Sequence, residues 1–399
     1  MKVCLINNLY PPFARGGAEQ VVDKTVHGLV DHGAEVVVIT STPQRPERLT
    51  AGALTIYRIH PPNFFFYTAA RQYSFFLRLL WHGVDMFHYP AARAVRAILR
   101  HENPDIVHTH NLMGISFLVP RLVRRLGLRH LHTVHDVQLV EPSGIILKKK
   151  ENDWRYTGLS TQAYTALMKG LMGSPEAIIS PSQFLLDFYA VRGFFPASTK
   201  VMLRNPISLP AVRRRGATAA ELRFLYLGQI EEHKGVLFLA ESFRRLLVRY
   251  PDLECSLHIA GSGSASERLA ALAADCPRIV VHGRVEREAL PELFAAADVT
   301  IVPSLCYENS PTVIFESFSF GVPVVASRVE GIAELIREGE NGFTFKTEDS
   351  SALIERLLWC VRERAKLARM GSIACAGVQD LSLTTYINTL TELYRGDRT

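Results

Sequence analysis

Residues 222–247, LRFLYLG-QIEEHKG-VLFLAESFRRLL, contain the pattern that decides the fold. An apolar run (222–228) leads into a polar loop that ends at Gly235, and a segment with helical spacing of apolar residues follows (236–247). This order predicts a buried strand, a turn and an amphipathic helix. Working outward from this stretch, the same order of elements recurs along the chain.

Short apolar runs of strand type alternate with longer helical patterns in both halves of the sequence. Continuous Val, Ile and Leu runs separated by helices are typical of parallel sheets that helices cover on both faces. We therefore expect an α/β protein with two Rossmann-like domains. The expected strands are 3–7, 35–40, 54–59, 105–110, 128–135, 177–180 and 200–204 in the first half, and 222–228, 254–261, 278–283, 298–304 and 323–327 in the second.

The segment RNPISLP (204–210) and the polar run after it (211–221) mark the expected joint between the domains. We expect an N-terminal domain over 1–207 and a C-terminal domain over 208–380. The stretch 381–399 is expected to form a final helix. Two open parallel sheets in tandem imply a cleft, and ligands of such sheets bind beyond the carboxyl ends of the strands. The loops after the apolar runs are therefore the places to look for chemistry.

Composition and charge exclude several classes of protein. The chain has 399 residues, 48% hydrophobic and 21% charged, as in a globular protein with a sizeable core. Residues 1–208 hold 23 Lys and Arg against 14 Asp and Glu, a net of +9, whereas 209–399 hold 22 against 25, a net of −3. A basic half can attract phosphates or an anionic membrane surface, and ordinary surface charge is an equal alternative. Nucleic-acid binding has only this charge in its favour, because no known module is present.

Targeting and metal signals are sparse. The six cysteines are scattered without metal-ligand spacing, which indicates reduced packing residues of a cytoplasmic protein. The start, MKVCLINN, has an apolar run that is too short for the hydrophobic region of a secretory signal. The sequence contains no run of about 18 apolar residues, so we expect no membrane-spanning helix. No metal site is expected.

Glycines and one lysine follow several expected strands. Gly16 and Gly17 precede a helical pattern, Gly261 follows the run 254–261, and another glycine turn precedes Arg284 and Val285. Such turns let backbone N–H groups approach an anion or a planar base, but for Gly16 and Gly17 taken alone a simple tight turn is the better explanation. Lys234 stands where a cation can meet a diphosphate, and the alternative is a solvated surface lysine.

Residues 308–316, ENSPTVIFE, hold two glutamates with seven residues between them. Ser310 is the expected N-cap and Pro311 the first residue of a helix that runs to about Phe320. Glu308 then lies in the loop and Glu316 within the helix. Carboxylates suit polyols because they accept hydroxyl hydrogen bonds, so this stretch predicts a sugar or ribose site. The alternative is that Glu316 is a solvent-facing helix residue.

These motifs together resemble family 4 of the glycosyltransferases, a large group of retaining, nucleotide-sugar-dependent enzymes with the GT-B fold. The resemblance rests on GQIEEHKG, on ENSPTVIFE with the following SFSFGVPVVAS, on GGAE (16–19), on HTHN (108–111) and on TVHD (133–136). It spans roughly residues 1–395. It implies an acceptor-binding N-terminal domain, a donor-binding C-terminal domain facing it across a central cleft, and a C-terminal helix that packs back on the first domain.

The resemblance also implies roles for matching residues. Glu316 would bind the ribose, Glu308 the donor sugar, and Lys234 the diphosphate. Backbone groups would assist at Gly16, Gly17, Asn309, Ser310, Pro311 and Thr312, while Gly261, Arg284 and Val285 would lie near the nucleotide, Arg284 and Val285 at its base. His135 would lie at the reacting face, whereas we expect His108 and His110 to be structural.

One position departs from the family pattern. Many members carry an arginine directly after the glycine of the GQIEEHKG motif, and this chain has Gln229 there. The diphosphate charge would then be met by Lys234, helix dipoles, or another cation such as Arg15 or Arg204. The resemblance implies no metal and no cofactor, and the sequence has no Asp-x-Asp at a strand end.

The acceptor is the least defined part. The segment FFFYTAARQYSFFLRLLW (64–81) places Tyr73, Phe76, Leu77, Leu80 and Trp81 on one helical stripe. Such a stripe can rest on a bilayer and guide a lipid-linked glycan of a surface polysaccharide, or it can face the core. We expect a UDP-sugar donor, with GDP as an alternative, and a cytoplasmic location that includes the inner face of the membrane.

Three other functions compete with transfer. A GT-B epimerase would isomerise the donor without an acceptor, and a binding subunit would retain the donor without turnover. The presence of Glu308, Glu316 and Lys234 together disfavours the binding subunit. A dinucleotide-dependent dehydrogenase is disfavoured because no G-x-G-x-x-G follows the first strand.

Overall fold

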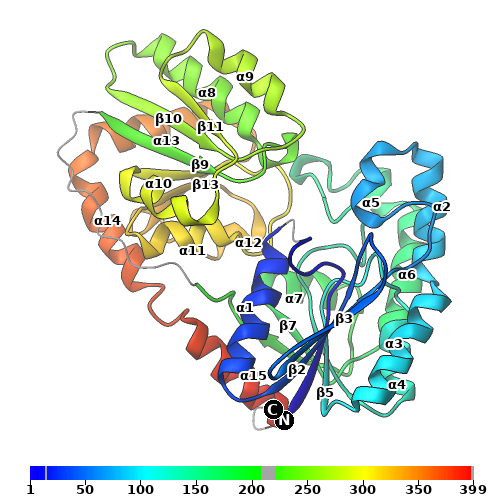
Figure 1. The fold of residues 1–399 in the computed structure, drawn as a ribbon. Helices are drawn as coiled ribbons and strands as arrows, with labels where there is room; N and C mark the ends of the chain where they lie inside the picture. The colour runs from blue at the N-terminus through cyan, green and yellow to red at the C-terminus, as the bar shows by residue number, and fades with distance from the viewer. Residues whose placement is uncertain (14–15, 208–220, 397–399) are drawn as a thin grey trace. The chain divides into compact units, whose positions relative to one another are not determined.

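The computed structural model describes residues 1–13, 16–207 and 221–396. The chain divides into two compact units (Figure 1). Unit 1 comprises Met1–Gly144, Trp154–Pro206 and Leu383–Thr399, and unit 2 comprises Ile145–Asp153 and Ile207–Ser382. The expected N-terminal domain is corrected in one respect, because Ile145–Asp153 leaves it and belongs to unit 2. We call Ile145–Asp153 the strap.

Unit 1 is built on an eight-stranded sheet in the order β3-β4-β2-β1-β5-β6-β7-β8. All strand pairs are parallel except β3 with β4. Its strands are β1 (Lys2–Ile6), β2 (Glu35–Ser41), β3 (Glu47–Ala51), β4 (Leu54–Ile59), β5 (Ile106–Thr109), β6 (Arg129–Thr133), β7 (Ala177–Ser180) and β8 (Thr199–Met202). Its helices are α1 (Gly17–Asp31), η1 (Tyr67–Gln72), α2 (Phe75–Met86), α3 (Tyr89–Glu102), α4 (Val119–Arg125), α5 (Trp154–Thr157), α6 (Leu159–Met172), α7 (Gln183–Ala190) and α15 (Leu383–Arg395).

The sequence put the buried strands of unit 1 in place to within one or two residues, but β3 was missed. Every residue of β3 is exposed, so it lacks the apolar signal on which the prediction depends. The central strands are buried on both faces, as parallel sheets require. Val3 and Leu5 face one core together with Val22 and Val26 of α1.

The C-terminal helix α15 packs on α1 (Figure 1). A Cβ on Gly28 would come within 2.6 Å of the Ile387 side chain, so the absence of a side chain at Gly28 permits this close approach. Ile387 and Tyr394 are buried in the same core as β1. The last helix in the sequence is therefore an integral part of the first unit.

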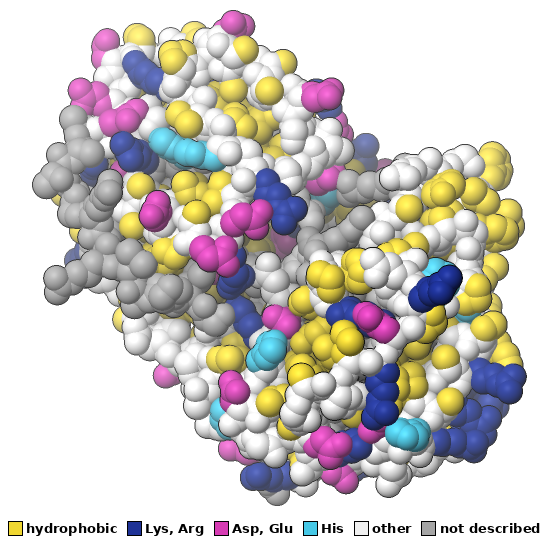
Figure 2. Space-filling view, viewed as in Figure 1, with side chains coloured by type: hydrophobic (Ala, Val, Ile, Leu, Met, Phe, Trp, Pro, Cys, Tyr) yellow, Lys and Arg dark blue, Asp and Glu magenta, His cyan; other side chains and the backbone are white. Residues whose placement is uncertain are grey.

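The predicted aromatic stripe is divided in the structure. Trp81 is buried and its indole N–H donates to the Phe65 carbonyl oxygen at 2.7 Å, whereas Phe76 is 77% exposed and Leu80 59% exposed. The expectation of a single stripe was therefore wrong. Helix α2 instead buries one side and presents a second apolar face to solvent, which is visible among the hydrophobic side chains in Figure 2. This exposed face consists of Phe76, Leu79, Leu80, Val84 and Phe87, the last directly after the helix.

Unit 2 is built on a six-stranded sheet in the order β11-β10-β9-β12-β13-β14, with every pair parallel. Its strands are β9 (Leu222–Leu227), β10 (Cys255–Ala260), β11 (Ile279–Gly283), β12 (Val299–Val302), β13 (Val324–Ser327) and β14 (Gly342–Phe345). Its helices are η2 (Lys148–Lys150), η3 (Glu232–Lys234), α8 (Val236–Arg249), α9 (Ser266–Ala274), η4 (Arg287–Ala289), α10 (Leu290–Ala296), α11 (Thr312–Ser319), α12 (Glu330–Ala333), α13 (Ser350–Arg362) and α14 (Arg364–Ala376). Only β14 lacked a predicted counterpart.

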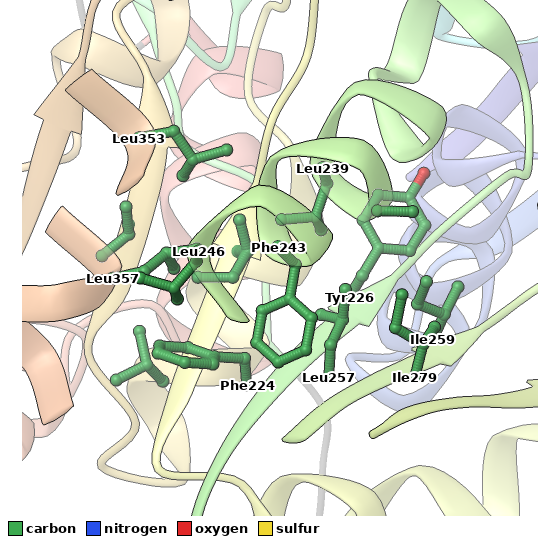
Figure 3. Close-up of a cluster of buried hydrophobic side chains, with 14 of the residues drawn as sticks. Phe224, Tyr226, Leu239, Phe243, Leu246, Leu257, Ile259, Ile279, Leu353 and Leu357 are labelled. Atoms are coloured by element: carbon green, nitrogen blue, oxygen red, sulfur yellow. The ribbon is translucent and has the colours of Figure 1, made fainter. Parts of the chain in front are cut away.

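The stretch that opened the sequence analysis forms β9, η3 and α8. Phe224 and Tyr226 on one face of β9 meet Leu239, Phe243 and further residues of α8 and α13 (Figure 3). The opposite face of β9 carries Leu225, which packs in a separate cluster with α10. Phe243 is fully buried, so Phe243→Ala should cost about 3–5 kcal/mol of unfolding free energy.

No helix in the described part of the chain is long and apolar enough to cross a membrane.

Candidate active site

The strand order of unit 2 reverses direction between β9 and β12. In an open parallel sheet, this switch point leaves a crevice beyond the carboxyl ends of the two strands. The loop after β9 carries Lys234, and the loop after β12 carries Glu308. The topology therefore brings together two of the residues that the sequence analysis selected, although they are 74 positions apart.

Lys234 and Glu308 form an ion pair with 2.6 Å between Nζ and Oε1. The Ser304 hydroxyl donates to the same carboxylate oxygen at 2.8 Å. Burial lowers the pKa of Lys234, but the charge of Glu308 and its hydrogen bond outweigh burial, and the net pKa is raised. The Lys234 side chain is therefore a fixed cation at neutral pH. The interpretation of Lys234 as a solvated surface lysine was wrong.

Gly235 brings the two loops into contact. Its φ of +74° lies in the left-handed region, and a Cβ there would come within 1.9 Å of the Pro303 carbonyl oxygen. The Leu305 N–H donates to the His233 carbonyl oxygen at 2.9 Å. A glycine at this point is thus required for the lysine loop to pack against the segment that leads to Glu308.

Gly331 supports the Glu308 loop from the other side, and sequence analysis did not identify it. Its N–H donates to the Glu308 carbonyl oxygen at 3.1 Å. A Cβ on Gly331 would come within 1.8 Å of the Asn309 carbonyl oxygen. In the sequence, Gly331 is only a glycine in a short helical segment that follows an apolar run. Nothing in that pattern indicates a contact with residues 308–309.

Helix α11 begins at Thr312, with Pro311 as its N-cap, so the predicted N-cap at Ser310 is corrected by one residue. The Ser310 hydroxyl oxygen is buried and has no hydrogen-bond partner among the described residues. Asn309, Pro311 and Thr312 are partly buried beside it. A buried hydroxyl beside a helix N-terminus can donate to an anionic ligand.

Glu316 lies inside α11 and is only 8% exposed, so the alternative of a solvent-facing helix residue was wrong. Arg287 of η4, which sequence analysis missed, has its Nη2 atom 3.9 Å from Glu316 Oε1. This pair connects α11 with the loop that carries Arg284 and Val285. A carboxylate held this way can accept hydroxyl hydrogen bonds while its charge is partly balanced.

The other donor residues predicted in unit 2 have local structural explanations. A Cβ on Gly261 would come within 1.8 Å of the Gly228 carbonyl oxygen, and φ is +146°, so backbone packing alone requires this glycine. Gln229 is exposed, and its carbonyl oxygen accepts from the Tyr226 hydroxyl at 2.6 Å. Arg284 is 75% exposed and pairs with Glu286 at 3.2 Å. Val285 packs against the cluster that contains Leu290.

Unit 1 has an equivalent switch point between β1 and β5. The Asn8 N–H donates to the Asn111 carbonyl oxygen at 2.8 Å, and the Asn111 N–H donates to Asn7 Oδ1 at 3.1 Å. Gly16 and Gly17 open α1 as expected, but the Gly16 N–H donates to Glu19 Oε2 at 2.9 Å. The amide predicted to contact a phosphate is therefore already paired within the chain. Arg15 lies outside the described residues.

Histidines line the same edge of unit 1. His108 shares hydrogen bonds with the Tyr394 hydroxyl at 2.6 Å and the Thr133 hydroxyl at 2.7 Å, which fixes it between α15 and β6. His110 Nδ1 lies 3.0 Å from His135 Nε2. The Nε2 atom of His110 is buried without a partner among the described residues. His110 and His135 line a cavity of about 20 Å³, room for roughly one water molecule.

These histidines are neutral at physiological pH. Burial lowers the pKa of His135 to about 4 and that of His108 to about 3, and it lowers the pKa of His110 well below its usual range. A neutral imidazole has one N–H donor and one acceptor nitrogen. The His110–His135 pair can therefore hold an uncharged hydroxyl group.

Among the described residues, no group of three or more His, Cys, Asp or Glu side chains is arranged to hold a metal ion.

Comparison with known proteins identifies both units. Residues 16–206 match the family described as glycosyl transferase 4-like domain, and residues 221–363 match the family described as glycosyl transferases group 1. A relative, an uncharacterized glycosyltransferase of Methanocaldococcus jannaschii, is 26% identical over 91% of this chain and 91% of its own.

Two solved structures resemble the whole fold. Sucrose-phosphate synthase from Thermosynechococcus elongatus superposes with a TM-score of 0.76 at 18% identity, covering 99% of this chain and 98% of its own. The Anabaena protein HepE, solved in complex with UDP, superposes with a TM-score of 0.72 at 18% identity, covering 99% of this chain and 100% of its own. The fold implied by the resemblance, GT-B with two Rossmann-like domains, is confirmed.

Proposed function

The chain belongs to the GT-B glycosyltransferases of family 4, and on that premise we propose that it transfers a sugar from a nucleoside diphosphate sugar to an acceptor hydroxyl with retention of anomeric configuration. The observation that carries the proposal is the Lys234–Glu308 ion pair at the switch point of unit 2. It combines a cation for phosphate with a carboxylate for sugar hydroxyls. The UDP complex of HepE favours UDP over GDP as the nucleotide.

In our proposal, each of several residues of unit 2 binds a different part of the donor. Lys234 neutralises charge on the leaving diphosphate, which is the step where electrostatic stabilisation contributes most. Glu308 accepts hydrogen bonds from the donor sugar, and Ser310 donates its unpartnered hydroxyl to a phosphate oxygen. Glu316 accepts from the ribose hydroxyls, next to Arg287. Because these groups and the N-terminus of α11 supply the charge, the proposed reaction needs no metal and no cofactor.

The neutral Gln229 gives the diphosphate one cation fewer than many relatives have. Gly16 does not compensate, because its N–H is engaged by Glu19. Lys234 therefore carries a larger share of diphosphate binding in this chain, and donor affinity should depend on it strongly.

His135 positions the acceptor in the proposed reaction. Because its pKa is about 4, the His135 imidazole is neutral at pH 7 and has a single N–H. It therefore orients or polarises a hydroxyl group and does not act as a general acid. A phosphate oxygen of the leaving group accepts the acceptor proton in this scheme.

The acceptor in our proposal is a lipid-linked or surface-polysaccharide glycan at the cytoplasmic face of a membrane. The support is the exposed apolar face of α2, five large side chains with helical spacing and Arg78 exposed among them. Such a face inserts into the boundary of a bilayer, and an arginine beside it meets anionic headgroups. The occupant we propose for this face is an anionic lipid surface.

A transfer assay with a panel of UDP- and GDP-sugars tests the proposal. The expected product is a glycoside with the anomeric configuration of the donor, read by NMR, and it should form only when an acceptor is supplied. If the donor is epimerised when no acceptor is present, the protein is an epimerase and the transferase proposal is wrong. An inverted product would exclude the retaining mechanism.

A further inference from the structure

Unit 2 contains a cavity on the side of its sheet where the carboxyl ends of the strands lie, the side that also carries Lys234 and Glu308. It has a volume of about 610 Å³, within the usual range for small-ligand sites. Arg328 follows β13 and Lys346 follows β14, so these residues lie at the carboxyl ends of the two strands that follow β12 in the sheet order. The strap and α13 complete the wall. We call this cavity the lysine pocket.

Cations dominate its lining. Five cationic side chains line it against two carboxylates, and the seven are Lys148, Lys149, Arg328, Lys346, Arg356, Glu151 and Glu355. Neighbouring carboxylates pair with several cations, including Glu348 with Lys149 at 3.0 Å. Lys346 is exposed and has no ion pair within the described ranges. Carboxylates beside the pocket pair with Lys148, Lys149, Arg328 and Arg356, so Lys346 is the lining cation left to attract an anionic group.

Glu151 adds a second requirement. Its Oε1 atom lies 3.6 Å from Lys148 Nζ, whereas its Oε2 atom is buried with no hydrogen-bond partner in the described part of the chain. A carboxylate oxygen only accepts hydrogen bonds, so it calls for a hydroxyl or N–H donor. A ligand with hydroxyl groups and one anionic group satisfies both the cations and Glu151.

The strap, which forms one wall of the pocket, is hydrogen-bonded to the loop that carries Glu308. The Lys148 N–H donates to the Leu305 carbonyl oxygen at 2.9 Å, and the Tyr307 N–H donates to the Ile146 carbonyl oxygen at 2.8 Å. The strap thus pairs with the segment between Ser304 and Glu308. Lys148 also pairs with Glu330, the neighbour of the Gly331 that supports the Glu308 loop. A ligand held by the strap contacts the elements that position Glu308.

We propose that the lysine pocket binds an anionic sugar, one that carries a carboxylate or a phosphate. The sugar reaches it either as part of the acceptor glycan or as a free effector. The acceptor alternative rests on the proposed transferase function, whereas binding itself does not.

Calorimetry tests binding with glucuronic acid, glucose 6-phosphate and neutral glucose on the full chain. We expect at least one anionic sugar to bind saturably and glucose to bind at least tenfold more weakly. Lys149→Ala and Lys346→Ala should each weaken binding about fivefold, as expected for partly exposed ion pairs. Lys150→Ala is the matched control, since Lys150 is exposed on the same strap, does not line the pocket, and should leave binding unchanged.

Absence of saturable binding, equal binding of glucose, or an equal effect of Lys150→Ala would overturn the proposal. All three lysines are on the surface, so a thermal melt should show unchanged folding.

Kinetics then separates the two sources. If the anionic sugar is part of the acceptor, Lys346→Ala raises the KM of the charged acceptor only. If it is an effector, adding the free sugar changes the rate with a neutral acceptor, and Lys346→Ala abolishes that change. If the transferase proposal is wrong and the pocket proposal is right, Glu316→Ala will leave the affinity for the sugar nucleotide unchanged, and the anionic sugar will still bind.

Discussion

The two units share the same strand connectivity around the switch point of their sheets, but the side chains at that point differ in chemistry. In each unit, the strand that comes first in the sequence lies beside the switch point. This strand is β1, between β2 and β5, in unit 1, and β9, between β10 and β12, in unit 2. The crevice of unit 1 is lined by neutral imidazoles and amides, with the pKa of His135 lowered to about 4. The crevice of unit 2 holds a charged pair, with the pKa of Lys234 raised.

The difference shows that topology sets where a ligand binds and side chains set what it is. Neutral groups that donate and accept single hydrogen bonds suit an uncharged hydroxyl. A cation beside a carboxylate suits a phosphate attached to a sugar. The comparison predicts that the two units respond differently to pH and to substitution.

Acid should destabilise unit 1 first, and this is the largest effect we expect. Burial lowers the folded-state pKa of His108 and His130 to about 3 and that of His135 to about 4, below the ordinary 6.5. The unfolded chain therefore binds more protons, and stability falls as pH drops from about 6.5 towards these values, by about 1.4 kcal/mol per pH unit for each histidine. The raised pKa values of Asp85 and Asp136, about 7 and about 6, oppose this trend but are outnumbered.

Urea unfolding between pH 7 and 4.5 measures the acid effect. In a Trp359→Phe variant, the remaining tryptophans, Trp81 and Trp154, belong to unit 1 and report on it alone. His108→Gln should reduce the slope with pH, and His27→Gln, on the exposed side of α1, should not. A unit 1 midpoint that stays constant or rises on acidification would contradict the neutral-histidine assignment.

Removing the cation of unit 2 should affect catalysis more than removing a neutral group of unit 1. Lys234→Ala should lower kcat about 10²–10³-fold, because charge on the leaving diphosphate loses its fixed partner. His135→Gln should lower it only about tenfold, the worth of one neutral hydrogen bond. Steady-state kinetics with Lys366→Ala as an exposed control makes the comparison. Equal losses at Lys234 and His135 would remove the distinction between the two crevices.

Gly331→Ala should damage the unit 2 site without touching a ligand. The new Cβ would overlap the Asn309 carbonyl oxygen, so the Glu308 loop must shift, at a cost of about 2–3 kcal/mol of unfolding free energy and with loss of donor binding. Gly170→Ala, in helix α6 with nothing within 4 Å of its Cβ, should stabilise by about 0.5–1 kcal/mol. Thermal melts of both variants measure the change in stability, and donor titrations measure the change in donor affinity. Normal donor binding by Gly331→Ala would show that this contact does not position Glu308.

Sequence reasoning located most elements because parallel strands buried on both faces leave continuous apolar runs. It failed at β3, which is wholly exposed, and at β14, where Gly342 and Thr344 interrupt the apolar run. It also failed at the strap, whose residues give no sign that they pair with the 305–307 segment. Lys234, Glu308 and Glu316 were found from their motifs. Gly331 and Arg287 were missed because their importance comes from contacts between loops that are distant in sequence. The Glu19 bond to Gly16 was missed for a different reason, since the two residues are only three apart but the glycine pair was assigned to a ligand.

The apolar face of α2 should give the smallest effect, confined to membrane binding. Phe76→Ser and Leu80→Ser should each weaken binding to anionic vesicles by about 1.5 kcal/mol, since part of each side chain would leave the lipid. Val248→Ser, at an exposed position of α8 in unit 2, is the control. Vesicle sedimentation measures this directly, and transfer to a soluble acceptor should not change. Vesicle binding that survives both α2 substitutions would remove this face as the lipid contact.

Calorimetric titration of UDP-, GDP- and ADP-sugars into the wild type and Glu316→Ala tests the central claim most directly. The account predicts that one nucleotide class binds and that the substitution weakens it by about 1.5–3 kcal/mol, because a buried carboxylate that accepts from the ribose is lost. Glu241→Ala, on the exposed side of α8, should bind like the wild type. Binding indifferent to Glu316, or no binding of any sugar nucleotide, would contradict a donor site at the switch point of unit 2.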